Sequence, residues 1–302
     1  MHEPLVSIVS VNYKQAQVTH EMLVSLQGIT YPNYEIIIVD NDSTTEELIP
    51  IVAQFPNTRL IRSAKNLGFA GGNNLGIAAA NGKYALFLNN DTEVSPGFLE
   101  PLVDLFEYAP DVGIASPKLI FHGTDNLIQY AGCSGINPWT GRSVTYGLME
   151  KDEGQHNIST ATALIHGAAM MVPMQLIRTV GLMPELYFLY YEELDWCEMI
   201  KRAGYHSHYV ANSTVYHKES VSVGQGSVMR TYYMYRNRLL YIRRNLEGIQ
   251  FWSGMLFFLF VAVPKQGLVF ALQLKYSYLH ALWRGLKWHL RLHGVHQNRF
   301  LS

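Results

Sequence analysis

Residues 84–88, YALFL, form an apolar run that ends directly in Asn89, Asn90 and Asp91. Side chains alternate between the two faces of a strand, so a strand without polar alternation is normally buried on both faces. Such strands occur in parallel sheets that carry helices on both sides. Open α/β sheets bind ligands at the carboxyl ends of their strands. The polar residues that follow the run therefore indicate either a plain turn or part of a binding site.

The first hundred residues alternate between strand-like and helix-like segments. Strands are expected at 5–11, 35–39, 58–62 and 84–88, and helices at about 15–27, 44–54 and 71–80. This alternation predicts βαβ units and a parallel sheet. Residues 111–165 are rich in Gly, Pro and Asn and predict strands joined by long loops. Further along, we expect a buried strand at 163–173 and helices at 185–203 and 229–244.

Composition excludes several classes of protein. Of the 302 residues, 48% are hydrophobic and 16% are charged, which is typical of a globular protein with a sizeable core. The two cysteines, Cys133 and Cys197, are far apart and show no metal-binding spacing, which favours a reducing cytoplasm. The N-terminus leads directly into a strand pattern, so we expect no signal peptide. Nucleic-acid binding is not expected, because residues 1–228 are acidic and contain no base-stacking motif.

Charge divides the chain into two parts. Residues 1–228 contain 12 Lys and Arg against 23 Asp and Glu, whereas residues 229–302 contain 11 Lys and Arg and a single acid, Glu247. Residues 248–264 are uncharged, slightly fewer than the roughly 20 apolar residues of a spanning helix. We expect a helical C-terminal tail (residues 229–302) that lies in the interface of an anionic membrane. A true span or hairpin and a helical pair packed on the core are the alternatives.

Three further polar clusters follow expected elements, and His217 stands apart from them. The clusters are VDNDS at 39–43, KNLGFAGGNN at 65–74 and YYEELDW at 190–196. Taken singly, each cluster is weak evidence for a functional site. The first is also a common helix-cap sequence, and the second has neither dinucleotide nor P-loop spacing. Acids at the start of a helix are favoured by its dipole, and a lone histidine is more often structural than a ligand.

Taken together and in order, these motifs resemble family 2 glycosyltransferases of the rhamnosyltransferase-like group. The resemblance covers about residues 4–244, in VSVNY, VDNDS, NLGFAGGNN, LFLNNDT, HGAAMMVP, FLYYEELDW, His217 and YRNRLLY. It implies a GT-A type α/β fold, in which a Rossmann-like mixed sheet flanked by helices binds a nucleotide-sugar. It also implies that residues 1–228 form the catalytic domain, with a nucleotide-binding half at 1–110 and an acceptor-binding half at 111–228.

The resemblance further implies an inverting transfer of a sugar to an acceptor hydroxyl with the help of a divalent cation. The family's metal motif is a pair of acids, but its first position here is Asn89, so Asp91 is the carboxylate expected to hold the ion. His217 is the second expected ligand. Mn²⁺ or Mg²⁺ is the expected cofactor, and an imidazole ligand favours Mn²⁺. Glu193 is the expected catalytic base, with Glu192 as the alternative.

Binding roles are implied in the same way. Asp40 is expected to pair with the imide of a uracil or thymine base. The expected nucleotide-sugar-binding residues are Asn12, Asp40, Asn66, Gly72, Asn73, Asn89 and Asn90. The expected acceptor-binding residues are Gly167, Ala168 and Trp196. The arginines between Arg230 and Arg244 are expected to meet an anionic leaflet or a lipid diphosphate.

The leading hypothesis is a metal-dependent hexosyltransferase that is peripheral on the cytoplasmic face of a bacterial-type cell membrane. It would use a dTDP- or UDP-linked donor, with dTDP-rhamnose as the first candidate, and a glycan acceptor that is lipid-linked. Cell-surface polysaccharide or O-antigen synthesis is the expected setting. A nucleotidyltransferase is one alternative, although residues 11–14 lack a basic glycine-rich loop. A non-catalytic nucleotide-sugar-binding protein is the other, and Asn89 favours it.

Overall fold

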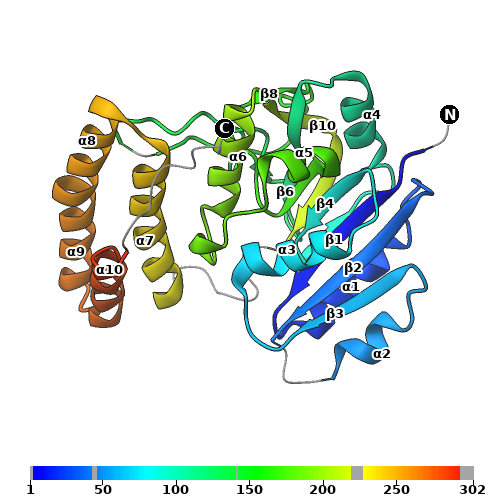
Figure 1. Ribbon diagram of the computed structural model, residues 1–302, viewed down its shortest axis with the longest axis horizontal. Helices are drawn as coiled ribbons and strands as arrows, with labels where there is room; N and C mark the ends of the chain where they lie inside the picture. Colours follow the sequence, from blue (N-terminus) through cyan, green and yellow to red (C-terminus); the bar gives the residue numbers. More distant parts are fainter. Residues whose placement is uncertain (1–2, 43–45, 141, 219–226, 293–302) are drawn as a thin grey trace.

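A single mixed sheet forms the centre of the molecule, and helices cover both of its faces (Figure 1). The computed structural model describes residues 3–42, 46–140, 142–218 and 227–292. Within them the sheet has the strand order β3-β2-β1-β4-β9-β6-β10-β5, while β7 pairs with β6 and β8 with β10. The strands are β1 (Val6–Asn12), β2 (Tyr34–Asn41), β3 (Thr58–Ser63), β4 (Tyr84–Leu88), β5 (Thr92–Val94), β6 (Val112–Phe121), β7 (Ile128–Tyr130), β8 (Thr160–Thr162), β9 (Ala169–Pro173) and β10 (His206–His217). The expected mixed α/β sheet flanked by helices is confirmed.

The N-terminal half has the expected parallel arrangement. β1 pairs in parallel with β2 and β4, and β2 pairs in parallel with β3. The connecting helices are α1 (Ala16–Leu26), α2 (Leu48–Val52) and α3 (Gly68–Ala79). The expected start of the second helix at 44–45 lies outside the described residues. Because parallel strands end at the same edge of the sheet, Asn12 at the end of β1 pairs with Asp40 of β2.

β4 is buried on both faces, as its composition predicted. Tyr84 stacks on Phe106 of α4 (Glu100–Tyr108), with ring centroids 5.3 Å apart. Phe87, which has the opposite parity in the strand, packs against Trp196 of α6 (Glu192–Arg202) at 5.5 Å. The neighbour of β4 on its other edge is β9, and this pair is antiparallel. Strand pairing in the sheet therefore changes from parallel to antiparallel at β4. The carboxyl end of this strand leads into Asn89, Asn90 and Asp91.

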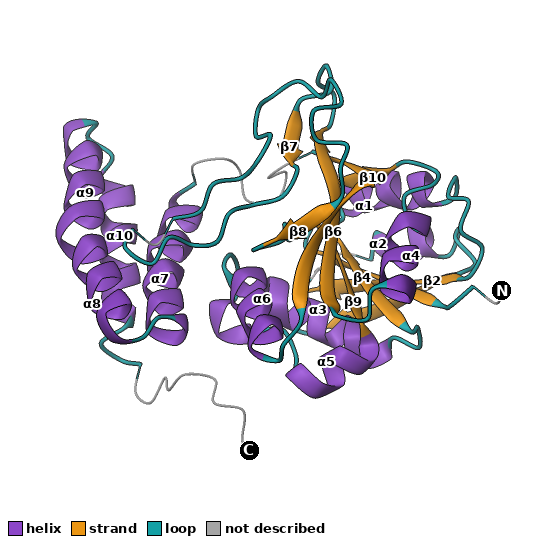
Figure 2. Ribbon diagram, turned by 90° about the horizontal axis from the view of Figure 1, so that it is seen from above, coloured by secondary structure: helices purple, strands orange, loops and turns teal. Residues whose placement is uncertain are grey.

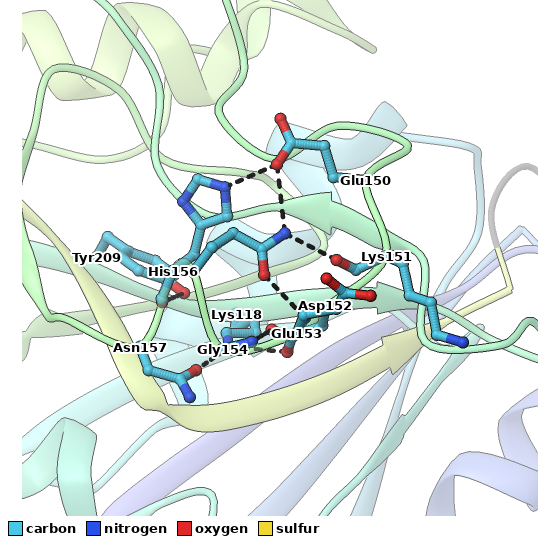
Figure 3. A network of polar contacts seen from close by, with 10 residues as sticks. Lys118, Glu150, Lys151, Asp152, Glu153, Gly154, His156, Asn157 and Tyr209 are labelled. Carbon is cyan, nitrogen blue, oxygen red and sulfur yellow. Dashed lines mark hydrogen bonds and ion pairs between the residues drawn. The ribbon is translucent and has the colours of Figure 1, made fainter.

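A buried lysine fastens the long loop between β7 and β8 to the sheet (Figure 3). Lys118 of β6 is 3% exposed, and its Nζ lies 2.8 Å from Oδ2 of Asp152 and 2.5 Å from Oδ1 of Asn157. A buried ammonium group is tolerated only with such partners. Nearer the surface, the Glu150 carboxylate contacts His156 Nε2 at 3.2 Å. These contacts order a loop that composition alone describes only as irregular.

Two expected elements are shorter than their sequences indicated. The strand expected at 163–173 exists only as β9, because residues 166–168 turn before the strand begins. The helix expected at 185–203 is divided into a 3₁₀ turn, Glu185–Tyr187, and α6. Between them, Phe188, Tyr190 and Tyr191 have positive φ angles of 65°, 69° and 78°, which no α-helix contains. α5 (Met174–Val180) connects β9 to this region.

The described part of the C-terminal tail forms a layer of helices separated from the sheet by α6 (Figure 2). Its elements are α7 (Val228–Asn245), α8 (Gly248–Phe257), a π-helical turn (Phe258–Ala262), α9 (Val263–Leu272) and α10 (Tyr276–Trp288). They share a small core of their own, formed by Leu239, Ile242, Phe258, Ala262, Val263, Phe270 and Leu282. α7 also packs on α6 and on the 3₁₀ turn. Because α7 contacts both the tail helices and α6, the expected boundary between a catalytic domain and a tail at residue 228 stays a prediction.

The helix Gly248–Leu272 has 25 residues and is long and apolar enough to cross a membrane. Only 22% of its most apolar 18-residue stretch is buried against the rest of the protein. Seven large apolar side chains along this helix are exposed. They are Ile249, Trp252, Leu256, Phe260, Val261, Leu268 and Leu272. One side of this helix thus packs on the other tail helices, and the other side is an uncovered apolar stripe.

Candidate active site

The two expected metal ligands lie side by side. Nε2 of His217 is 3.1 Å from Oδ1 of Asp91, and both side chains are buried. The sheet produces this contact, because β10 pairs in antiparallel register with β5 and places His217 opposite Thr92. Asp91 comes directly before Thr92, at the carboxyl end of β4. Sheet pairing thus brings together two residues that are 126 positions apart.

Gln129 of β7 orients the imidazole. Its Oε1 lies 2.8 Å from Nδ1 of His217 and accepts an N–H from it, which turns Nε2 toward the Asp91 carboxylate. Nε2 donates to that carboxylate when it carries a hydrogen, and it offers a lone pair to a cation when it does not. A lone pair and a carboxylate that face each other need a cation or a proton between them. The described residues contain no group of three or more His, Cys, Asp or Glu side chains that could hold a metal. Asp91 and His217 nevertheless fit a cation such as Mn²⁺ that takes its remaining ligands from phosphate oxygens.

His166 lies beside this pair and was not expected in the site. Its ring centroid is 5.9 Å from that of His217, and its Nδ1 accepts a hydrogen bond from the backbone N–H of Ala168 at 3.1 Å. Burial, and then the neighbouring His217, lower the pKa of His166 to about 3. His166 is therefore a neutral side chain at physiological pH. A histidine inside the otherwise apolar run 163–173 is the sequence signal that could have indicated it.

The expected base lies against the expected acceptor floor. A Cβ atom added to Gly167 would lie 3.6–3.8 Å from Cγ, Cδ and Oε1 of Glu193, which is ordinary van der Waals contact, so the Glu193 side chain faces Gly167 across a methyl-sized space. The next residue, Ala168, is buried and contributes through its backbone, because its C=O accepts the N–H of Asn89 at 2.9 Å. The segment 166–168 thus lies between the end of β4 and the first turn of α6.

The two glutamates differ in their accessibility. Glu192 is buried, whereas Glu193 is half-buried. Burial, followed by the charge of Glu193, raises the pKa of Glu192 well above its ordinary value, and burial raises the pKa of Glu193 to about 7. The pKa of Glu193 therefore lies well above the ordinary glutamate value of about 4.3. Of the two, Glu193 is the less buried and the one that faces Gly167, and its Oε2 is buried without a hydrogen-bond partner among the described residues.

Asp40 occupies the carboxyl end of β2 on the nucleotide side of the site. It is 2% exposed, its Oδ2 lies 3.4 Å from Nε of Arg62, and its Oδ1 accepts a hydrogen bond from Nδ2 of Asn12 at 3.4 Å. A hollow of about 300 Å³ adjoins this pair. The hollow is lined by Asp42, Arg62, Ser63 and Ala64. The hollow therefore lies beside Arg62, the ion-pair partner of the carboxylate that the resemblance assigns to base recognition, and Asp40 itself does not line it.

Three of the expected asparagines shape this edge of the sheet. Oδ1 of Asn12 accepts from Oγ1 of Thr19 at 3.0 Å, and Nδ2 of Asn90 donates to the same hydroxyl oxygen at 3.1 Å. Oδ1 of Asn66 accepts the Gly68 N–H at 2.8 Å and an N–H of Asn41 at 3.1 Å. Asn41 was not expected, although it follows Asp40 directly. These amides fix the loops around the hollow, and their contact with a donor stays a prediction.

Gly72, Asn73 and Trp196 have other contacts. A Cβ at Gly72 would lie 2.8 Å from Cγ1 of Val11, so this glycine allows α3 to approach β1. The Asn73 side chain is buried and donates to the C=O of Phe69 at 3.0 Å. Neither observation supports a nucleotide-binding role. Acceptor binding by Trp196 is wrong, because the indole is fully buried and its Nε1 donates to the C=O of Gly181 at 3.0 Å.

The arginine cluster of α7 is also only partly exposed. Arg236 and Arg244 are 6% and 9% exposed, and Nε of Arg244 lies 2.8 Å from Oδ2 of the fully buried Asp195. The expectation that this cluster meets an anionic leaflet is therefore wrong for these two side chains. Their partners are in α6 and in the segment before it, close to Glu193.

Residues 7–180 match the family model described as Glycosyl transferase family 2. The chain belongs to glycosyl transferase family 2. This family 2 glycosyltransferase is 23% identical over 244 residues to an N-acetylglucosaminyl-diphospho-decaprenol L-rhamnosyltransferase of Mycobacterium tuberculosis, covering 72% of this chain and 77% of the relative. It is 26% identical over 227 residues to the dTDP-rhamnosyl transferase RfbF of Shigella flexneri, covering 70% and 72%. The expected rhamnosyltransferase-like resemblance is thereby confirmed.

Other curated relatives are longer than the matched region. The low-salt glycan biosynthesis hexosyltransferase Agl10 of Haloferax volcanii is 27% identical over 201 residues, and the match covers 65% of this chain and 61% of the relative. The uncharacterized protein y4gI of Sinorhizobium fredii is 27% identical over 262 residues, which are 82% of this chain but 28% of the relative. The glycosyltransferase thus spans less than two thirds of the length of each of these two proteins.

Solved structures confirm the fold class. GalNAc-T7 with UDP, GalNAc and Mn²⁺ superposes with a TM-score of 0.65 at 16% identity, covering 80% of this chain and 49% of that one. The mannosyltransferase PcManGT from Pyrobaculum calidifontis, in complex with GDP-Man and Mn²⁺, gives a TM-score of 0.58 at 14% identity, with 98% and 77% covered. At these identities the likeness shows a shared glycosyltransferase fold.

Proposed function

We propose that this family 2 glycosyltransferase is an inverting enzyme that moves a sugar from a nucleoside diphosphate to a hydroxyl of a lipid-linked glycan. The observation that carries the proposal is the placement of three side chains. Asp91 and His217 form a buried pair at the end of β4, and Glu193 lies against Gly167 at the start of α6. Glycosyl transfer needs separate groups for the leaving phosphate and for the attacking hydroxyl. The names of the mycobacterial and Shigella relatives support a rhamnosyl donor and a lipid-linked acceptor.

Glu193 acts as the general base in this proposal. Its carboxylate accepts the proton of the acceptor hydroxyl while the hydroxyl oxygen forms a bond to the anomeric carbon of the donor. The bond between that carbon and the phosphate oxygen breaks on the opposite side, so the configuration inverts and the nucleoside diphosphate leaves. A pKa near 7 suits this role, because a general base is most effective when its pKa is close to the working pH.

Asp91 and His217 are the residues that would hold a divalent cation, and Gln129, bound to Nδ1, directs Nε2 of His217 toward that position. When bound, the cation supplies positive charge that stabilises the leaving diphosphate. Two protein ligands suffice, because such cations also use substrate phosphates and water as ligands. The imidazole ligand favours Mn²⁺ over Mg²⁺.

Asp40 and the adjoining hollow support a pyrimidine nucleotide. A buried carboxylate accepts the imide N–H of uracil or thymine, and cytosine offers no such imide. The donor is therefore a dTDP- or UDP-linked sugar, with dTDP-rhamnose as the first candidate. Asn12, Asn66, Asn89 and Asn90 would line the base and ribose at the same edge of the sheet.

The C-terminal tail would attach the enzyme to the cytoplasmic face of the cell membrane. Two features support an interfacial position: the apolar stripe on the helix Gly248–Leu272, and the packing of the same helix on α7 and α10. A helix that is covered on one side lies in the membrane plane more readily than across it. Exposed basic residues of the tail would then meet anionic lipids.

A donor screen with the purified full-length protein tests this function. Release of nucleoside diphosphate is measured with dTDP-rhamnose, UDP-glucose and UDP-galactose, with Mn²⁺ or EDTA, and with a synthetic polyprenyl diphosphate-linked N-acetylglucosamine as acceptor. We expect release from one donor that requires both acceptor and Mn²⁺. A nucleotidyltransferase would instead release pyrophosphate from a nucleoside triphosphate. Donor binding without any release would indicate a non-catalytic binding protein and refute the proposal.

A further inference from the structure

The backbone immediately before Glu193 has an unusual conformation. Phe188, Tyr190 and Tyr191 have φ angles of 65°, 69° and 78°. Bulky residues rarely adopt this left-handed region, which persists only when the surrounding structure enforces it. Tyr191 is also the N-cap residue of α6. The position of Glu193 therefore depends on whatever holds this segment, residues 186–191, in place.

Asn237 of α7 holds the segment by its backbone carbonyls. Its Nδ2 lies 3.0 Å from the carbonyl oxygen of Tyr187, 2.7 Å from that of Leu189 and 2.7 Å from that of Tyr190. Asn237 is fully buried. A left-handed segment cannot satisfy these carbonyls by helical hydrogen bonds, so a side-chain donor from another helix replaces them.

Arg236 adds donors to the same segment. Its Nη2 donates to the carbonyl oxygen of Leu186 at 3.0 Å and also to that of Tyr187. The guanidinium is held between two rings, 4.7 Å from the ring centroid of Tyr233 and 4.6 Å from that of Trp288 in α10. Ring packing of this kind restricts a long, flexible side chain to one orientation. The donors of Arg236 and Asn237 are thus both directed at residues 186–190.

The segment is also held from the nucleotide side. The carbonyl oxygen of Phe188 accepts the N–H of Phe69 at 2.6 Å. Gly68 has a φ of +72°, and a Cβ there would lie 2.2 Å from the same oxygen. Only glycine therefore permits this approach at the start of α3. The segment is fastened between α3 and α7, and Glu193 follows directly from it.

We propose that Asn237, supported by Arg236, is a positioning residue that holds Glu193 against Gly167 during transfer. The inference rests on the proposed role of Glu193 as the base. It assigns a catalytic contribution to α7, which lies beyond the expected catalytic domain, 1–228. Neither side chain touches the reacting atoms in this account, because both act through the backbone of residues 186–191.

The experiment uses the full-length protein carrying Asn237→Ser, with Asn245→Ser as the matched control. Asn245 lies on the same helix, but its Nδ2 donates to Oδ1 of Asp195 at 2.6 Å and not to the segment. Backbone hydrogen exchange of residues 187–193 is measured, together with kcat and KM for the donor found in the screen. We expect Asn237→Ser to accelerate the exchange at least about 10-fold and to lower kcat about 100-fold, with donor KM changed less than about 2-fold. Unchanged exchange and kcat, or equal effects of the two substitutions, would overturn the proposal.

Glu193→Gln separates this inference from the proposed function. If Asn237 acts by placing Glu193, then Asn237→Ser should lower the residual turnover of the Glu193→Gln enzyme by less than about 2-fold. If Asn237→Ser lowers turnover as much in the Glu193→Gln enzyme as in the wild type, Asn237 does not act by positioning Glu193. The assignment of Glu193 as the base would then stand. Full turnover by Glu193→Gln alone would contradict the base assignment, and the positioning proposal with it.

A second variant keeps the test decisive if Asn237→Ser does not fold. Arg236→Lys retains the positive charge but loses the forked donors that reach two carbonyls. We expect it to accelerate exchange in residues 187–193 and to lower kcat about 10-fold, again with little change in donor KM. Wild-type exchange and kcat in a folded Arg236→Lys protein would count against the proposal.

Discussion

Oδ1 of Asp91 and Nε2 of His217 lie 3.1 Å apart, although the two residues are 126 positions apart in the sequence. The imidazole is oriented by Gln129 on its other nitrogen, so the pair directs one carboxylate and one ring nitrogen to the same point. This is a minimal ligand set for a cation that also binds the phosphates of a nucleotide. The geometry makes Gln129 the residue on which the tautomer of His217 depends.

Replacing Gln129 should therefore weaken metal binding without removing a ligand. We expect Gln129→Leu to raise the dissociation constant of Mn²⁺, measured by calorimetry with UDP present, about 10- to 100-fold, because loss of an orienting partner has effects of this size. Gln155→Leu is the control, since Gln155 contacts Glu150 and the backbone of the distant 150–157 loop. Equal Mn²⁺ affinity in the Gln129→Leu and wild-type proteins would show that Gln129 does not orient a ligand.

The pH dependence of turnover should report Glu193. Burial raises the pKa of Glu193 to about 7, and only its carboxylate form accepts the hydroxyl proton. We therefore expect kcat to rise about tenfold per pH unit below pH 7 and to level off above it. Tyr191 and Cys197, which face Glu193, stay neutral because burial raises the pKa of each to about 12. A rise in kcat centred near pH 4.5 would mean that the Glu193 carboxyl group is not desolvated in the working enzyme.

Loss of the buried Lys118 should destabilise the protein where the β7–β8 loop packs on β6. Lys118→Met leaves the Asp152 carboxylate, which is 20% exposed, without its ammonium partner. We expect a loss of about 2 kcal/mol in the free energy of unfolding, less than for a fully buried pair because water still reaches Asp152. Lys151→Met is the control, because Lys151 and Asp125 form an exposed pair, and it should change stability by less than about 0.5 kcal/mol. Denaturant unfolding measures both, and equal values would contradict a structural role for Lys118.

The apolar stripe of the tail should decide membrane binding. We expect the double substitution Trp252→Ser and Phe260→Ser to abolish flotation of the full-length protein with phosphatidylcholine–phosphatidylglycerol vesicles, because both side chains are exposed on the stripe. Ile158→Ser is the control, since this residue is 81% exposed but lies in the β7–β8 loop. Flotation should fall as salt rises, since basic residues contribute. Flotation of the double variant at the wild-type level would show that the apolar stripe is not the membrane-binding surface.

Local sequence patterns were sufficient to predict the parallel strands of the N-terminal part of the sheet. The strands around residues 5–11, 35–39, 58–62 and 84–88 alternate with helices, and parallel strands necessarily end at one edge. That rule brings Asn12 beside Asp40 in the structure. The family resemblance, and not periodicity, indicated that His217 would join Asp91.

Long-range contacts could not be predicted in this way. Gln129 is an ordinary mid-strand residue until β6 and β7 place it beside His217. Trp196 stands three residues after Glu193, and its burial in the core follows from how α6 packs on β4. The helix expected at 185–203 is interrupted because buried donors from α7 hold residues 186–191 in a conformation that those residues do not favour locally. In each case the deciding partner is more than 40 residues away in sequence.

The central claim is that Glu193 activates the acceptor while Asp91 supports departure of the nucleotide, and acceptor-dependent turnover tests it most directly. Release of nucleoside diphosphate in the presence of Mn²⁺ is compared among wild type, Glu193→Gln and Asp91→Ala, each with its melting temperature. We predict that each substitution lowers kcat about 1,000-fold while the protein stays folded. Turnover at the wild-type rate by either folded variant would contradict the account.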